Sequence, residues 1–288
     1  MSAVQVKAFL DNDSETFSYV VYDSNSRDAV IIDPVLDFDY KSGRTKNEGA
    51  DRILAFVAAE SLKVAWILET HAHADHLSAA PYLRRALGAK IGIGENIKKV
   101  QAIFKDVFNL EKSFLPNGAD FDHLFSDGET FTVGSMEFRV MHTPGHTPAD
   151  LTYVLNDSKA FVGDTLFLPD VGTARCDFPG GSAHQLFQSI QKILALGDDA
   201  EIYICHDYPP KGREHQYVTT VKAQKQNSIH VHDGVSEDEF VEMREKRDAT
   251  LEMPRLILPS IQVNIRAGNM PPADDQGHTY LKIPINQL

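Results

Sequence analysis

Four side chains that can bind a metal ion lie within one short segment, residues 70–76. They are His71, His73, Asp75 and His76. The apolar run Val64–Leu68 before the segment predicts a buried strand, and residues 77–87 after it predict a helix. Open α/β sheets carry their chemistry at the carboxyl ends of strands, so we expect these side chains in a loop at such an end. Imidazole and carboxylate ligands suit zinc, iron or manganese, and the segment therefore predicts a metal site.

Three more polar residues follow predicted strands in the same way. They are His146, Asp164 and His206. Each has an ordinary interpretation when it is taken alone, as a turn residue, a helix cap or a core histidine. Together with a loop that already offers four ligands, they indicate a single metal site to which several strand ends contribute.

The elements that must position these residues form two β-rich halves, each with helices outside. We expect strands at residues 3–9, 17–22, 28–33, 89–94, 136–141, 151–155, 160–162 and 201–205, and helices at 48–62, 97–108, 182–196, 214–226 and 236–248. Residues 37–47 are poorly patterned, and an extended, proline-punctuated tail covers about 250–288. The chain has no low-complexity linker, which favours one domain over residues 1–288, built as two stacked sheets between helical layers.

Composition bounds the class of protein. The 288 residues are 42% hydrophobic and 24% charged, which is ordinary for a globular chain. No apolar run approaches the roughly 20 residues that span a bilayer, and the first residues lack a secretory signal pattern. The net charge of −13 argues against nucleic acid or an anionic membrane as a partner. Two cysteines are too few for a disulfide framework, so we expect a cytoplasmic protein.

The order and spacing of the seven polar residues resemble the metallo-β-lactamase superfamily. The pattern runs His71-x-His73-x-Asp75-His76, then His146, Asp164 and His206. This resemblance implies an α/β fold, a four-layered αβ/βα sandwich, with metal at the edge of its two sheets. Fold alone does not settle function, because one scaffold can host several chemistries.

A closer resemblance, to the persulfide dioxygenases (sulfur dioxygenases), runs nearly from end to end. It rests on the segments at residues 33–36, 70–76, 143–148, 161–166, 175–178, 206–208 and 264–268. The resemblance implies one Fe(II) per chain, held by His71, His146 and Asp164. Two histidines and one carboxylate leave three adjacent positions open on a non-haem iron, where sulfur and O₂ can meet. The implied reaction converts glutathione persulfide, O₂ and water to glutathione and sulfite.

The same resemblance leaves the other four polar residues with two possible roles. His73, Asp75, His76 and His206 either surround the metal ligands and orient them, or fill a second metal site with Asp164 bridging.

Because glutathione carries two carboxylates, its pocket should be locally basic. Candidate substrate contacts are Arg175, Tyr208, Lys211, Arg213 and Arg266. The implied partners are glutathione persulfide and O₂, and a homodimer is possible.

The main alternative is a dinuclear zinc hydrolase of the glyoxalase II type, which cleaves a glutathione thioester. That function would use all seven candidate ligands, and zinc would make hydroxide from a bound water. Against it, glyoxalase II usually carries a further histidine where this chain has Ala72, and a larger helical C-terminal domain. A purely structural metal site is less favoured, since such sites are closed by four ligands and often use cysteine.

Overall fold

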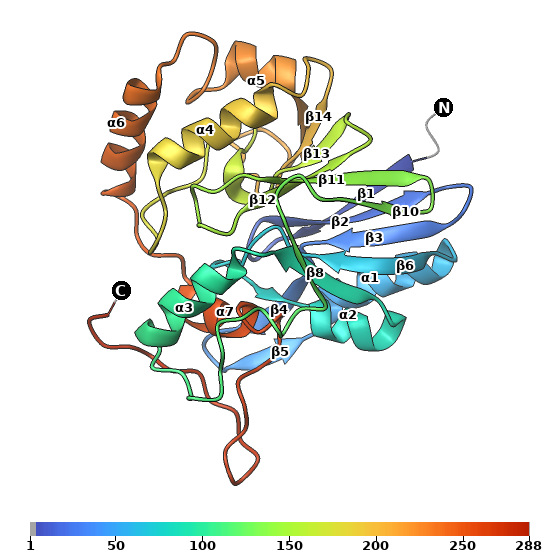
Figure 1. Ribbon diagram of the computed structural model, residues 1–288, viewed down its shortest axis with the longest axis vertical. Helices are drawn as coiled ribbons and strands as arrows, with labels where there is room; N and C mark the ends of the chain where they lie inside the picture. The colour runs from blue at the N-terminus through green and yellow to red at the C-terminus, as the bar shows by residue number, and fades with distance from the viewer. Residues whose placement is uncertain (1–3, 288) are drawn as a thin grey trace.

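Two six-stranded sheets form the centre of the molecule (Figure 1). The computed structural model describes residues 4–287, so residues 1–3 and 288 of the expected domain lie outside it. In spatial order the first sheet contains β1 (Val4–Asp11), β2 (Thr16–Asp23), β3 (Asp28–Ile32), β6 (Lys63–Leu68), β8 (Lys90–Gly94) and β9 (His123–Phe125). The second contains β10 (Thr130–Val133), β11 (Met136–His142), β12 (Leu151–Leu155), β13 (Lys159–Phe161), β14 (Glu201–Tyr203) and β15 (Val218–Thr220).

Apolar side chains fill the space between the two sheets. In β11 the two-residue period of a strand places Met136, Phe138 and Val140 on one buried face. They pack in one cluster with residues of the first sheet, including Tyr19 and Val30. β2 is buried on both faces, because helices cover the far side of its sheet.

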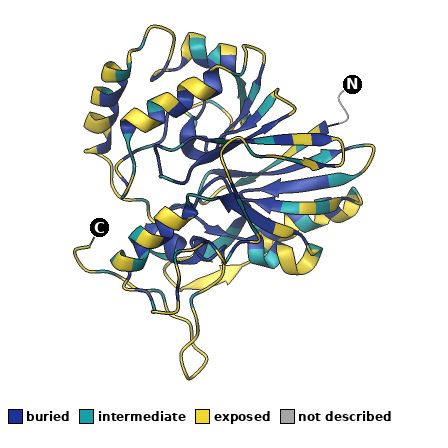
Figure 2. Ribbon diagram, in the orientation of Figure 1, coloured by how far each residue is buried: buried dark blue, intermediate teal, exposed yellow. Residues whose placement is uncertain are grey.

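Helices form the two outer layers. Against the first sheet pack α1 (Glu48–Ala59), α2 (Ala80–Leu87), α3 (Ile97–Val107) and α7 (Ile257–Asn264). Against the second pack α4 (Ala183–Leu194), α5 (Val221–Asn227) and α6 (Glu237–Asp248). Figure 2 shows the sheets largely buried and the outward helix faces exposed. The four-layered αβ/βα sandwich predicted from the sequence is confirmed. Among the described residues, no helix combines the length and apolar character that crossing a membrane requires.

Local structure differs from the expectations in three places, two of them around the metal-bearing segment. The poorly patterned residues 37–47 contain a hairpin of β4 (Val35–Asp39) and β5 (Arg44–Lys46), and β4 also pairs with β7 (Leu77–Ser78). The helix expected from residue 77 therefore begins at Ala80. The helix expected at 214–226 begins only at Val221, because residues 218–220 form β15 and Thr220 accepts a hydrogen bond from the Ala223 amide, which caps α5 at that point.

The expectation of an extended tail over about 250–288 is also corrected, because this segment contains α7. Pro259 favours an irregular chain in a sequence pattern, yet it is the third residue of α7. A proline is tolerated in the first turn of a helix, where the amide that it lacks would have no partner. Buried Ile257 and Ile261 then hold α7 on the core under the first sheet.

Candidate metal centre

The loops that carry the predicted ligands meet at one edge of the sandwich. They follow β6, β11, β13 and β14, so each lies at the carboxyl end of a strand. Backbone hydrogen bonds join the two halves here. The Phe17 amide donates to the Cys205 carbonyl at 2.7 Å, and the Leu151 amide donates to the Thr70 carbonyl at 3.1 Å. Residues far apart in the sequence therefore share one site.

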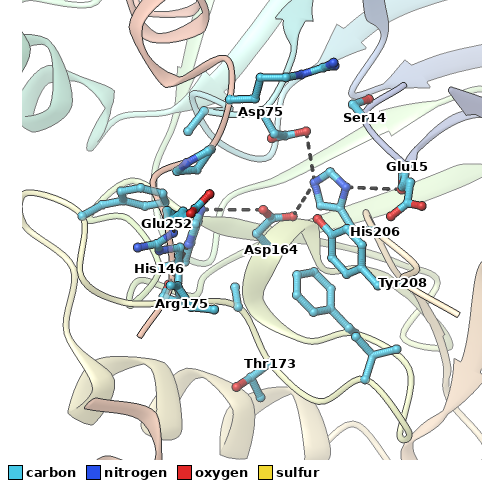
Figure 3. Close-up of a pocket in the computed structure, with 18 of the residues that line it drawn as sticks. Ser14, Glu15, Asp75, His146, Asp164, Thr173, Arg175, His206, Tyr208 and Glu252 are labelled. Carbon is cyan, nitrogen blue, oxygen red and sulfur yellow. Dashed lines mark hydrogen bonds and ion pairs between the residues drawn. The ribbon is translucent and has the colours of Figure 1, made fainter. Parts of the chain in front are cut away.

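His71, His146 and Asp164 form the first group of candidate ligands. Their ligand atoms lie within 4.8 Å of one another, and all three side chains are buried. The Nε2 atoms of His71 and His146 lie 3.8 and 3.6 Å from Asp164 Oδ2. Figure 3 shows His146 and Asp164 directed toward each other. Gly163, at φ +54°, lets the loop that carries Asp164 pack against Thr70, because a Cβ there would lie 2.5 Å from Thr70 Oγ1.

Hydrogen bonds on the far side of each ring fix both histidines of this group. His146 Nδ1 lies 2.7 Å from the Arg175 carbonyl, which only accepts, so Nδ1 carries a proton and Nε2 is the atom that faces the site. Thr70 Oγ1 donates to Asp33 Oδ2 at 2.9 Å and therefore accepts from His71 Nδ1 at 3.0 Å.

The free atoms of the group fit a metal ion. Burial, followed by the nearby His73 and His146 rings, holds the pKa of His71 well below its usual range, so this ring is neutral. His71 Nε2 and Asp164 Oδ1 are buried without a hydrogen-bond partner. Buried polar atoms are normally paired, and a bound cation would satisfy these two.

The remaining predicted ligands lie beside the first group. The ligand atoms of His73, Asp75 and His76 also lie within 4.8 Å of one another. His206 Nε2 lies 3.3 Å from Asp164 Oδ1 and 3.4 Å from Asp75 Oδ2, between the two carboxylates in Figure 3. The structure thus brings together all seven residues that the sequence analysis singled out. Their arrangement offers donors for one metal ion or for two.

A buried carboxylate, Asp33, holds the metal-bearing loop from below. It accepts hydrogen bonds from the Thr70 amide at 2.7 Å and from His73 Nε2 at 3.0 Å, besides the Thr70 hydroxyl. Burial alone would lower the pKa of His73, but the charge and hydrogen bond of Asp33 outweigh it and raise that pKa well above its usual range. In the sequence analysis Asp33 belongs only to the segment 33–36 that resembles the persulfide dioxygenases. Its role in holding the loop was not predicted, because sequence does not show where its oxygens point.

Asn264, at the end of α7, holds the same loop from the other side. Its Nδ2 donates to the carbonyls of His73 and His76 at 2.8 Å each, and its Oδ1 accepts from the Ser78 amide at 2.8 Å. The side chain is only 4% exposed. The C-terminal segment that resembled a family signature is thus a structural part of the metal centre.

A cavity of about 470 Å³ opens onto the site (Figure 3). Asp75, His146, Asp164 and His206 line its inner end. Two of the predicted substrate residues, Arg175 and Tyr208, also line the cavity. The guanidinium of Arg175 pairs with both oxygens of Asp177 at 2.5 and 2.6 Å and donates to the Glu252 carbonyl at 2.6 Å.

The other three predicted substrate contacts lie outside the lining of this cavity. Arg213 pairs with Asp207 at 2.5 Å and with Asp170 at 2.8 Å. Arg266 pairs with Glu111 at 2.9 Å and lies over the Phe114 ring. Lys211 is exposed outside the cavity wall. The basic residues that do line it, besides Arg175, are Arg244, Arg247 and Arg255. The sequence analysis did not select them, because Arg244 and Arg247 belong to the highly charged α6 and Arg255 lies in the segment between α6 and α7.

The two cysteines are buried. Burial raises the pKa of the Cys176 thiol, which disfavours the thiolate that a sulfur acceptor would need. The thiol of Cys205 lies in a candidate ligand group with Asp164 and His206. The sequence analysis does not include Cys205 among the candidate ligands.

Known proteins resemble this chain over most of its length. A family model described as the metallo-beta-lactamase superfamily matches residues 12–206. A Burkholderia pseudomallei protein named probable metallo-hydrolase is 51% identical, over 98% of this chain and 99% of its own. A Dictyostelium discoideum protein named glyoxylase B2 is 48% identical, over 99% of this chain and 98% of its own. The human mitochondrial persulfide dioxygenase ETHE1 is 30% identical, over 89% of this chain and 86% of its own. The crystal structure of ETHE1 from Myxococcus xanthus matches with a TM-score of 0.72 and 30% identity, over 92% of this chain and 100% of that one.

Proposed function

The chain belongs to the metallo-β-lactamase superfamily, and we propose that within it this protein is a glutathione-dependent persulfide dioxygenase. It converts glutathione persulfide, O₂ and water to glutathione and sulfite, with release of two protons, at one Fe(II) per chain. The observation that carries the proposal is the group of His71, His146 and Asp164. Both rings are held by their Nδ1 protons and turn Nε2 toward the carboxylate at the floor of an open cavity. The similarity to proteins named persulfide dioxygenase supports it.

In this proposal His71, His146 and Asp164 hold the iron, and the cavity holds the substrate. An Fe(II) ion bound by two histidines and one carboxylate supplies adjacent open positions for sulfur and O₂. Phe167 and Phe178 line the cavity and give it an apolar wall beside His206 and His146. His206 lies between Asp164 and Asp75, and it is placed to orient the Asp164 carboxylate or a water beside it.

A dinuclear zinc hydrolase acting on a glutathione thioester is the second candidate. The specific observation in its favour is the second ligand group, His73, Asp75 and His76, next to the first. The names of the Burkholderia and Dictyostelium proteins point the same way. In such an enzyme zinc would lower the pKa of a bound water and so provide the nucleophile.

Metal content and oxygen consumption distinguish the two candidates. We expect anaerobically iron-loaded protein to contain about one iron per chain and to consume O₂ with glutathione persulfide, releasing sulfite. The zinc-loaded protein serves as the control and should consume none. A protein that holds about two zinc ions, hydrolyses a glutathione thioester and leaves O₂ untouched would overturn the proposal.

Replacement of Arg175 by Ala should raise KM for glutathione persulfide roughly tenfold and change kcat less. The reason is that Ala removes a cationic side chain from the cavity wall but keeps the backbone carbonyl that holds His146. Steady-state oxygen electrode measurements give both constants. Lys211→Ala is the matched control, since this exposed lysine lies outside the cavity. An unchanged KM in Arg175→Ala would remove Arg175 from the substrate site.

A further inference from the structure

Helix α6 lies beyond the residues that the family model matches, and it carries a buried ion pair. Arg244 is 1% exposed and Asp248, one turn later, is 5% exposed. Arg244 Nε and Nη2 donate to Asp248 Oδ1 at 2.9 and 2.6 Å. Arginine is almost never fully buried without a partner, so this pair is a specific feature of the helix rather than part of its solvated charge.

The pair holds one short segment at two points. Arg244 Nη1 donates to the Thr173 carbonyl at 3.0 Å, and Asp248 Oδ2 accepts from the Cys176 amide at 2.8 Å. Arg175 lies between these two points, and its carbonyl accepts the Nδ1 proton of His146 at 2.7 Å. The ring of Phe178, on the same segment, meets the His146 ring edge-on at 5.0 Å. Residues 173–178 therefore form the immediate support of His146.

We propose that Arg244 and Asp248 are positioning residues for the metal ligand His146. By fixing the segment on both sides of Arg175, they fix the carbonyl that orients the imidazole and so aim Nε2 at the metal. The inference rests on the proposed function only in that His146 is taken as a metal ligand. It applies equally to a centre with one iron and to one with two zinc ions.

The competing interpretation is that the pair only attaches α6 to the body of the protein. Phe240, on the same helix, already does this, since it is fully buried in the cluster under the second sheet and packs on Phe187. Loss of a Phe240 contact should lower stability without moving the Arg175 carbonyl. Phe240→Leu is therefore a matched control for general destabilisation of α6.

The test uses Asp248→Asn in the full chain, with Co(II) as the probe of the metal site. Asn has the shape of Asp but only one acceptor oxygen, which the charged Arg244 will take. The NH₂ group of the new side chain would then face the backbone N–H of Cys176. Both groups are donors, so the hydrogen bond between residue 248 and Cys176 is lost. We expect Co(II) affinity, measured by competition with a chromophoric chelator, to fall about tenfold or more, and the visible Co(II) spectrum to change.

The double variant Arg244→Met with Asp248→Leu removes both charges and leaves none buried alone, which folded proteins often tolerate. It should show the same loss of Co(II) affinity and the same spectral change, whereas Phe240→Leu should lower the melting temperature and show neither. Folded variants with the affinity and spectrum of the parent protein would overturn the inference while leaving the proposed function intact. A parent protein that binds no Co(II) would instead contradict the proposed function.

Discussion

Replacement of Asp164 by Ala should abolish both iron retention and O₂ uptake. Asp164 is the one carboxylate in the group with His71 and His146, and its Oδ2 lies within 3.8 Å of both Nε2 atoms. Its other oxygen lies 3.3 Å from His206 Nε2, so the side chain connects the first group to His206. The two imidazoles without the carboxylate lack the negative charge that offsets a divalent cation, and we expect bound iron to fall below about a tenth of the parent level.

Iron content after desalting and O₂ consumption with glutathione persulfide measure these two effects. Asp198→Ala is a suitable control, because it also removes one carboxylate but acts on an exposed pair with Lys225. Circular dichroism establishes that both variants are folded. If Asp164→Ala kept its iron and its oxygen uptake, Asp164 would not be a ligand, and the proposed centre would have to be rebuilt from the second group.

The candidate ligands could be found from the sequence because the information is local. Each ligand-bearing loop directly follows a short apolar run, and strands that run in the same direction in the two stacked sheets bring these ends to one edge of the sandwich. His71 to His76 also lie so close in the chain that no fold could separate them. The layers of the fold follow from the same apolar periodicity, because buried strands and amphipathic helices each have an apolar face that must pack against another element.

The substrate side of the site could not be found in this way, because it depends on which partner each charge meets. Arg213 and Arg266 were plausible basic residues, but Asp207 and Glu111 pair with them away from the cavity. Arg244 stands in a helix where most residues are charged, and nothing local indicates that its face is the buried one. Such assignments need the packing of α6 and α7 against distant loops, which no periodicity encodes.

Replacement of Asp33 by Ala should destabilise the protein by about 3 kcal/mol or more and weaken metal binding with it. Asp33 is 2% exposed and accepts from the Thr70 amide, the Thr70 hydroxyl and His73 Nε2. Ala would leave the amide and the ring nitrogen buried without this acceptor. The Thr70 hydroxyl, which accepts the hydrogen bond from His71 Nδ1, would lose its fixed orientation. The candidate ligand His71 would then become mobile.

Urea unfolding of the metal-free protein measures the change in folding stability separately from the change in metal binding. Asp33→Asn is the informative comparison, because φ of residue 33 is +49° and asparagine, unlike alanine, adopts this conformation readily. Asn also keeps one acceptor for the Thr70 amide but removes the charge that faces His73, so its stability should lie between the parent and Asp33→Ala. Equal unfolding midpoints for all three proteins would show that Asp33 does not support the loop. A loss confined to Asp33→Ala would assign the effect to backbone conformation and the Thr70 contact rather than to the charge.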